Sequence, residues 1–181
     1  WVGVGLLMTV FVINLLVETA RLKHPGLNEK VLRFWGPLMR SCEVNRISGV
    51  APYLASAALA IAFFPKPIAI LSILFLAVGD PVASLLGVLY GQYGFRFSNG
   101  KSALGTLAGV LSCVALAMCF GVSAGWMQAA GPLGLLAFSL WAGVAGGVAE
   151  LLPLEMDDNF TIPIVSGLLS WFAALMFGIP L

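Results

Sequence analysis

Residues 67–91 read PIAILSILFLAVGDPVASLLGVLYG, an apolar stretch in which Asp80 is the one charged side chain. A helix needs about 20 mainly apolar residues to cross the hydrocarbon core of a bilayer, and this stretch is longer than that. A carboxylate at such a depth costs several kcal/mol and normally faces a cavity, a cation or a reaction. The segment therefore predicts a transmembrane helix that carries a functional acid.

The composition of the whole chain is that of a membrane protein. Of its 181 residues, 60% are hydrophobic and 9% are charged, whereas globular domains carry about 25% charged residues. The other apolar runs are 1–17, 47–64, 102–123, 133–152 and 160–178. We expect an all-α polytopic integral membrane protein with about six transmembrane helices. Residues 1–181 would form one membrane-embedded domain, with a catalytic helical core at 47–178.

The segment 18–46 is more polar and reads as a cytoplasmic amphipathic helix lying at the membrane interface. Its apolar residues recur at helical spacing: Leu27, Val31, Leu32, Trp35 and Leu38. We expect an interruption near Gly36-Pro37, because proline disrupts a helix interior.

The basic residues are distributed asymmetrically between the loops. Six of the nine lie between the first two spans, Arg96 and Lys101 lie between the third and fourth, and Lys66 falls on the opposite side. The positive-inside rule then puts the first, third and fifth loops in the cytoplasm of a bacterial inner membrane or an ER-type membrane. The net charge of +1 and the lack of a basic run give no indication of nucleic-acid binding.

Asp80-Pro81 is typical of a helix start, with Asp as the N-cap and Pro at the first helical position. Together with Gly79 it predicts a helix broken inside the membrane, whose second half begins at Asp80. Asp80, Ser84 and Gly87 share one helical stripe. The alternative is that the small residues make a close helix contact and that Asp80 is only a cap.

Residues 98–106, SNGKSALGT, contain Gly-Lys-Ser without a P-loop, because Phe95 stands where a P-loop has glycine. Ser102 is a plausible N-cap for the next helix, on which Gly105 and Gly109 form a small-xxx-small pair. A cation at a helix N-terminus is unfavourable, so an anion bound by Lys101 and Ser102 would resolve the conflict. The alternative is Lys101 as a membrane anchor.

The fifth loop is acidic: it contains Glu150, Glu155, Asp157 and Asp158, followed by Asn159. Carboxylates are the ligands that Mg²⁺ prefers, together with substrate phosphates. Asp157 and Asp158 would equally serve as caps for the last helix. In the first loop, Arg40, Glu43 and Arg46 are spaced three apart and share a helical face, either around a phosphate or in mutual ion pairs.

Three motifs together resemble one enzyme family. GDPVASLLG at 79–87, GKSALGT at 100–106 and EMDDNFTIP at 155–163 are similar to the membrane CTP-dependent lipid kinases, which include dolichol kinase, phytol kinase and CTP-dependent diacylglycerol kinase. More distantly they resemble phosphatidate cytidylyltransferases. Many family members have a basic residue at the position of Val88, and here Arg96 would supply that missing cation. Some members, among them dolichol kinases and cytidylyltransferases, have Glu at the position of Leu104.

The resemblance implies an all-helical enzyme that binds CTP with Mg²⁺ and phosphorylates a membrane lipid alcohol such as diacylglycerol, a polyprenol or phytol. It implies catalytic roles for Asp80, Lys101 and Asp158, with one of the aspartates as the base. The metal ligands would be Asp80, Asp157 and Asp158. The nucleotide contacts would be Ser84, Lys101, Ser102, Gly105, Thr106, Arg40, Arg46 and Arg96. Further candidates are Glu43, Gly79, Gly87, Glu150 and Asn159.

Two other functions stay open at this stage. A cytidylyltransferase would release CDP-lipid and pyrophosphate from the same motifs. A transporter would also use buried acids and broken helices, although transport needs polar groups that reach both faces of the membrane. The sequence leaves a homo-oligomer as an alternative to a monomer.

Overall fold

The computed structural model describes residues 1–39, 41–152 and 156–181, and these residues form helices and no β-strand. The α-helices are α1 (Val2–Lys23), α2 (Pro25–Trp35), α3 (Val50–Phe63), α4 (Lys66–Leu74), α5 (Asp80–Tyr90), α6 (Ala103–Ser123), α7 (Trp126–Leu151) and α8 (Asp158–Met176). The expected all-α architecture is confirmed.

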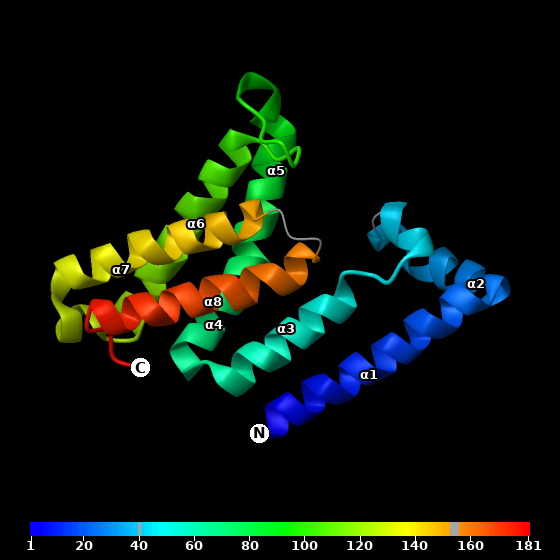
Figure 1. Cartoon of the computed structure of the whole chain (residues 1–181), viewed down its shortest axis with the longest axis horizontal. Coiled ribbons are helices and arrows are strands. Elements are labelled where there is room, and N and C mark those ends of the chain that lie inside the picture. The colour runs from blue at the N-terminus through cyan, green and yellow to red at the C-terminus, as the bar shows by residue number, and fades with distance from the viewer. Residues whose placement is uncertain (40, 153–155) are drawn as a thin grey trace.

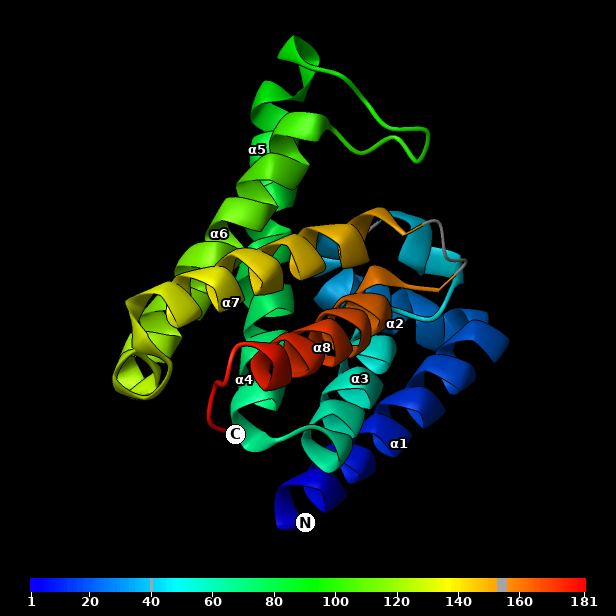
Figure 2. The ribbon, with the colours of Figure 1, turned by 60° about the vertical axis from the view of Figure 1, so that its left-hand side comes forward.

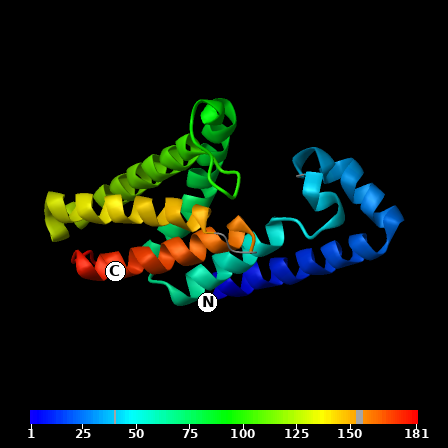
Figure 3. The same cartoon turned by 45° about the horizontal axis from the view of Figure 1, so that its top comes forward.

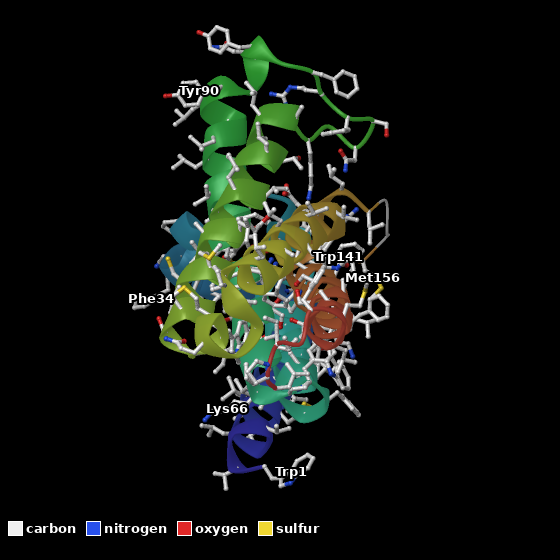
Figure 4. The ribbon with its side chains drawn as sticks, turned by 90° about the vertical axis from the view of Figure 1, so that its left-hand side faces the viewer. Trp1, Phe34, Lys66, Tyr90, Trp141 and Met156 are labelled. Carbon is white, nitrogen blue, oxygen red and sulfur yellow. The ribbon has the colours of Figure 1, made fainter. Side chains whose placement is uncertain are left out.

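Among the described residues, five helices are long and apolar enough to cross a membrane: α1, the continuous stretch Lys66–Tyr93, α6, α7 and α8. α3 is a shorter apolar helix of 14 residues. Lys66 and Tyr90 lie toward opposite ends of the molecule in Figure 4, as the ends of a spanning helix do. The chain is therefore a polytopic integral membrane protein with five long helices and a sixth short one.

The helices pack as a series of neighbours. α5 runs beside α6, α6 packs closely on α7, α7 packs on α8, and α8 packs on α3 (Figures 1 and 2). α5 and the start of α6 project away from the rest. α1 packs along α3, and α2 folds back from its end at the edge opposite α6 and α7 (Figure 3). The ends of α5, α6, α7 and α8 thus converge near the middle of the molecule.

The core is built from aromatic and aliphatic side chains of α4, α6, α7 and α8. Trp126 packs edge-to-face against Phe120 and Phe138, with ring centroids 5.3 and 5.2 Å apart. These contacts fix the turn between α6 and α7. Gly125 makes that turn in the left-handed conformation, with φ of 76°, where glycine carries no steric cost.

α7 consists of two helical pieces that meet at a kink in the GPLG stretch, 131–134. The longer piece begins after Gly131, close to the expected residue 133, and a short piece from Trp126 precedes it. Gly131 has φ of 73° there, just before Pro132. Proline removes one backbone hydrogen bond, so the kink is the ordinary result of that sequence.

The amphipathic segment 18–46 is divided between several elements. α1 continues to Lys23, and α2 begins with Pro25 at its first position, where proline is favoured. α2 ends at Trp35, before short 3₁₀ turns at Gly36–Leu38 and Ser41–Asn45. The interruption expected near Gly36-Pro37 is confirmed.

The expected break at Gly79-Asp80 is wrong, because the helix continues through it. Phe75–Gly79 form a π-helical turn between α4 and α5, and both Gly79 and Asp80 have right-handed helical dihedrals. The backbone N–H of Asp80 donates to the carbonyl of Phe75, five residues earlier. The wider π turn accommodates Pro81, which has no N–H and would crowd the preceding turn of an α-helix.

Close packing of α6 on α7 predicts a strong effect of one added methyl group. A Cβ at Gly143 would lie 2.9 Å from the Val110 carbonyl oxygen and 2.9 Å from the Val114 backbone nitrogen. Gly143→Ala should therefore lower the free energy of unfolding by about 1–3 kcal/mol. Gly5→Ala in α1 is the matched control, because nothing lies within 4 Å of the added atom. Equal melting temperatures for the two variants in detergent would contradict the close helix contact.

Candidate functional site

A cleft of about 340 Å³ opens where α5, α6, α7 and α8 converge, and we call it the polar cleft. Most of its lining belongs to the three motifs of the sequence. The lining residues are Asp80, Ala83, Ser84, Gly87, Val88, Arg96, Gly100, Lys101, Ser102, Gly105, Thr106, Glu150 and Asp158. Segments far apart in the chain therefore meet around one chamber.

The floor of the polar cleft depends on close contact between α5 and α6. A Cβ at Gly105 would lie 2.6 Å from the Ala83 carbonyl oxygen and 2.8 Å from the Gly87 Cα. One at Gly109 would lie 2.9 Å from the Ala83 Cβ. Glycine at these positions lets the backbones approach, which brings the first turn of α6 close to the face of α5 that carries Asp80.

Residues 91–102 form a hairpin that joins α5 to α6 and covers one rim of the polar cleft. The Gly100 N–H donates to the Phe97 carbonyl at 2.9 Å, and Gly100 has φ of 83°, which favours glycine in such a turn. Arg96 Nη1 donates to the Gly100 carbonyl at 2.9 Å. The hairpin thereby holds Arg96 and Lys101 at the same rim.

Ser102 is the N-cap of α6, as expected. Its Oγ accepts a hydrogen bond from the Gly105 N–H at 3.0 Å. Thr106, one turn further, is 8% exposed, and its Oγ1 has no hydrogen-bond partner among the described residues. A buried hydroxyl without a partner is costly, so a ligand in the polar cleft would give it one.

The ammonium group of Lys101 connects the hairpin to α7 and to α8. Its Nζ donates to Asp158 Oδ2 at 2.8 Å and to the Glu150 carbonyl at 2.7 Å, and it lies 3.5 Å from Glu150 Oε1. The Glu150 carbonyl belongs to the last turn of α7, where a cation is favourable. Lys101 is therefore stabilised by α7 and α8, although it precedes the start of α6.

The two adjacent aspartates have different positions. Asp157 is the N-cap of α8 and accepts from the Asn159 N–H at 2.9 Å, and its side chain is exposed. Asp158 follows it and lines the polar cleft. The cap reading thus applies to Asp157, and Asp158 is the aspartate of the pair that reaches the polar cleft.

The start of α8 is tied to α3 through a proline. Pro163 has no N–H, so the carbonyl of Asn159, four residues before it, has no partner within the helix. Ser56 Oγ on α3 donates to this carbonyl at 2.7 Å. A Cβ at Gly49, the N-cap of α3, would collide with the Asn159 side chain. Asp158 is therefore held in place by contacts on both sides of α8.

Several predicted residues lie outside the lining of the polar cleft. In the part of the chain that the structure describes, these are Glu43, Gly79, Arg46, Asp157 and Asn159. Gly79 lines a smaller adjoining cavity together with Asp80 and Glu150. Glu43 accepts from the Gly49 N–H at 2.8 Å and so stabilises the start of α3. Arg40 lies outside the described residues.

No group of three or more His, Cys, Asp or Glu side chains in residues 1–39, 41–152 and 156–181 is arranged to hold a metal ion alone. Three carboxylates nevertheless reach the polar cleft, those of Asp80, Glu150 and Asp158. Glu150 lies close enough to both aspartates to interact with their charges. Mg²⁺ commonly takes one or two carboxylates and completes its shell with substrate phosphates and water, so this donor set fits it.

A buried ion-pair cluster forms around Arg21 at the end of α1, and its backbone partners could not be predicted from the sequence. Arg21 is fully buried; its guanidinium binds the Glu18 carboxylate, Asn28 Oδ1 and the carbonyls of Glu43, Val44 and Arg46, at 2.7–3.2 Å. Glu18 also accepts from the Ser48 N–H at 2.9 Å. The i,i+3 spacing of Glu18 and Arg21 at the end of a span was the available signal.

Comparison with known proteins then gives the family. The chain is 35% identical over 176 residues to CTP-dependent diacylglycerol kinase 1 of Eremothecium gossypii, covering 90% of this chain and 56% of that protein. It is 31% identical over 157 residues to the protein of the same name in Schizosaccharomyces pombe, covering 84% of this chain and 72% of the relative. The chain belongs to the CTP-dependent lipid kinase family.

This CTP-dependent lipid kinase family member is also 32% identical over 130 residues to the chloroplastic farnesol kinase of Arabidopsis thaliana, covering 67% of this chain and 41% of that protein. The chain thus spans little more than half the length of its Eremothecium relative. No protein-family model and no solved structure gives a significant match.

The cap of α6 yields a prediction for this family member. Ser102→Ala should lower the free energy of unfolding by about 1 kcal/mol, because the Gly105 N–H loses its acceptor. Ser102→Asp should restore it, since aspartate is an equally good N-cap. Thermal unfolding in detergent measures both variants. If the alanine variant has the same melting temperature as the wild type, the cap contributes nothing to the stability of the protein.

Proposed function

We propose that this protein transfers the terminal phosphate of CTP to the hydroxyl group of a membrane lipid alcohol. The observation that carries the proposal is the convergence of the three family motifs on one polar cleft. The names of the relatives support CTP as the donor, and diacylglycerol or a prenol as the class of acceptor.

The cations and hydroxyl groups of the polar cleft suit a nucleotide triphosphate. Arg96 and Lys101 share one rim, and Ser102 and Thr106 lie at the start of α6, where backbone N–H groups favour an anion. Phosphoryl transfer needs positioning and charge neutralisation more than covalent chemistry from the protein. We assign the phosphates to this end of the polar cleft. On this assignment Arg96 supplies the cation that position 88 lacks.

The carboxylates of Asp158 and Glu150 lie beside Lys101. Asp80 and Asp158 would hold Mg²⁺, and Glu150 would support them. The bound metal would neutralise charge on the transferring phosphate and align its oxygens. In the structure the Lys101 ammonium contacts Asp158, so it holds this acid close to the phosphate site. One of Asp80 and Asp158 would accept the proton from the acceptor hydroxyl.

We also propose that the polar cleft faces the cytoplasm. The hairpin at its rim carries Arg96 and Lys101, and the segment that joins α1 to α3 carries most of the other basic residues. Lys66 is at the opposite end of the long helix (Figure 4). This orientation gives the site access to nucleotides.

An activity assay tests the reaction itself. The full chain in mixed micelles, with labelled CTP or ATP and Mg²⁺, should convert diacylglycerol or farnesol to the lipid phosphate, with CDP as the second product from CTP. CDP-lipid and pyrophosphate would instead identify a cytidylyltransferase. Absence of Mg²⁺-dependent CTP binding would contradict both the kinase and the cytidylyltransferase hypotheses, and the transporter would be the remaining hypothesis.

The adjacent aspartates provide a matched pair of variants. Asp158→Asn should lower kcat by at least about 100-fold, because it removes a charge from the reacting end of the polar cleft. Asp157→Asn should keep nearly full activity, since asparagine caps a helix as well as aspartate does. Asp80→Asn should behave like Asp158→Asn while the protein stays inserted and folded. Equal losses in the 157 and 158 variants would reject the assignment of Asp158.

A further inference from the structure

We infer that the lipid acceptor enters the polar cleft sideways, across the exposed face of α5, with its chain lying against Val88 and Leu85. This inference rests on the proposed function and adds the route and the residues that contact the acceptor. The face is defined here by Ser84, Leu85, Val88 and Leu89, and we call it the α5 face.

The wall that α5 contributes to the polar cleft is open to the outside. Ser84 and Val88 line the polar cleft, yet both are exposed, and the Val88 side chain is 81% exposed. Among the described lining residues, Val88 is the one large apolar side chain. The polar chamber and an apolar outer surface therefore share these two residues.

The α5 face is not covered by another helix in the described structure. α5 makes its main helix contact with α6, through Ala83, Gly87 and Gly91. On the other side Leu85 and Leu89 are 58% and 51% exposed. In Figures 1 and 2, α6 is the helix that runs alongside α5 where both project from the rest of the molecule.

The depth of these residues matches a lipid alcohol. Tyr90 ends α5, and tyrosine is enriched at the membrane–water interface. With a rise of about 1.5 Å per residue, Val88, Ser84 and Asp80 lie about 3, 9 and 15 Å below Tyr90 along the helix. A lipid hydroxyl that enters past Val88 reaches Ser84 and then the carboxylates, while its chain stays in hydrocarbon beside Leu85.

The two substrates then use separate openings of one chamber. The hairpin rim, with Arg96, Gly100 and Lys101, is polar and suits the nucleotide. The α5 face is apolar except at Ser84 and suits the lipid. Other lipid-facing surfaces, such as Leu107 and Leu111 on α6, are equally exposed, but they do not line the polar cleft. Continuity with the polar cleft is what assigns the α5 face to the acceptor.

A blocking variant tests the route. Val88→Trp should raise the apparent KM for diacylglycerol or farnesol in mixed micelles by about tenfold or more, with the KM for CTP unchanged, because only the lipid opening is narrowed. Leu107→Trp is the matched control at similar depth on α6, and it should retain wild-type constants. Thermal unfolding of both variants shows that they are folded.

A second measurement does not need catalysis. Diacylglycerol with a photoreactive diazirine in one acyl chain, reconstituted with the wild-type chain, should label the peptide that contains residues 82–90, and Val88→Trp should reduce that labelling. If α5 is labelled but no lipid phosphate forms, the proposed kinase reaction is rejected and the α5 face remains a lipid-binding surface. If lipid phosphate forms with equal KM values for the two tryptophan variants, the proposed route across the α5 face is rejected and the kinase reaction remains. Disulfide dimers of Val88→Cys would show that a second copy covers it, which also rejects the proposal.

Discussion

The contact between the Lys101 ammonium and the acids of α7 and α8 is the interaction on which the site depends. Three carboxylates at one chamber repel one another and are costly beside hydrocarbon unless a cation compensates them. Lys101 compensates Glu150 and Asp158 and also binds the free carbonyl at the end of α7. One side chain thus ties the hairpin to both α7 and α8, which also pack against each other.

The sequence predicted most of the fold because apolar length is a direct requirement of the bilayer. Helix ends were predicted best where a cap is local, as at Ser102, whose hydroxyl bonds within its own turn. They were missed where distant packing decides. The start of α7 at Trp126 follows from aromatic contacts with Phe120 and Phe138, which no local pattern records.

The candidate site shows the same division. Asp80, Lys101 and Asp158 were recognisable because acids and bases are rare in apolar segments, and the structure brings them to one chamber. The separate orientations of Asp157 and Asp158 depend on the first turn of α8, which the sequence left open. The burial of Arg21 could not be predicted, because most of its partners are backbone carbonyls, and backbone acceptors leave no trace in residue identity.

The π turn at Phe75–Gly79 has a consequence for how this segment tolerates change. A π turn contains one residue more than the α-helical turn it replaces, and it takes up that residue while the helices on either side keep their relative orientation. Removing one residue from within the turn would convert it to an ordinary α-helical turn and leave the direction of Asp80 relative to α4 unchanged. Removing one residue from α4 would instead rotate α4 against α5 by about 100°. The length of α4 is thus a constraint in its own right, whereas the turn itself could lose a residue and keep the direction of Asp80.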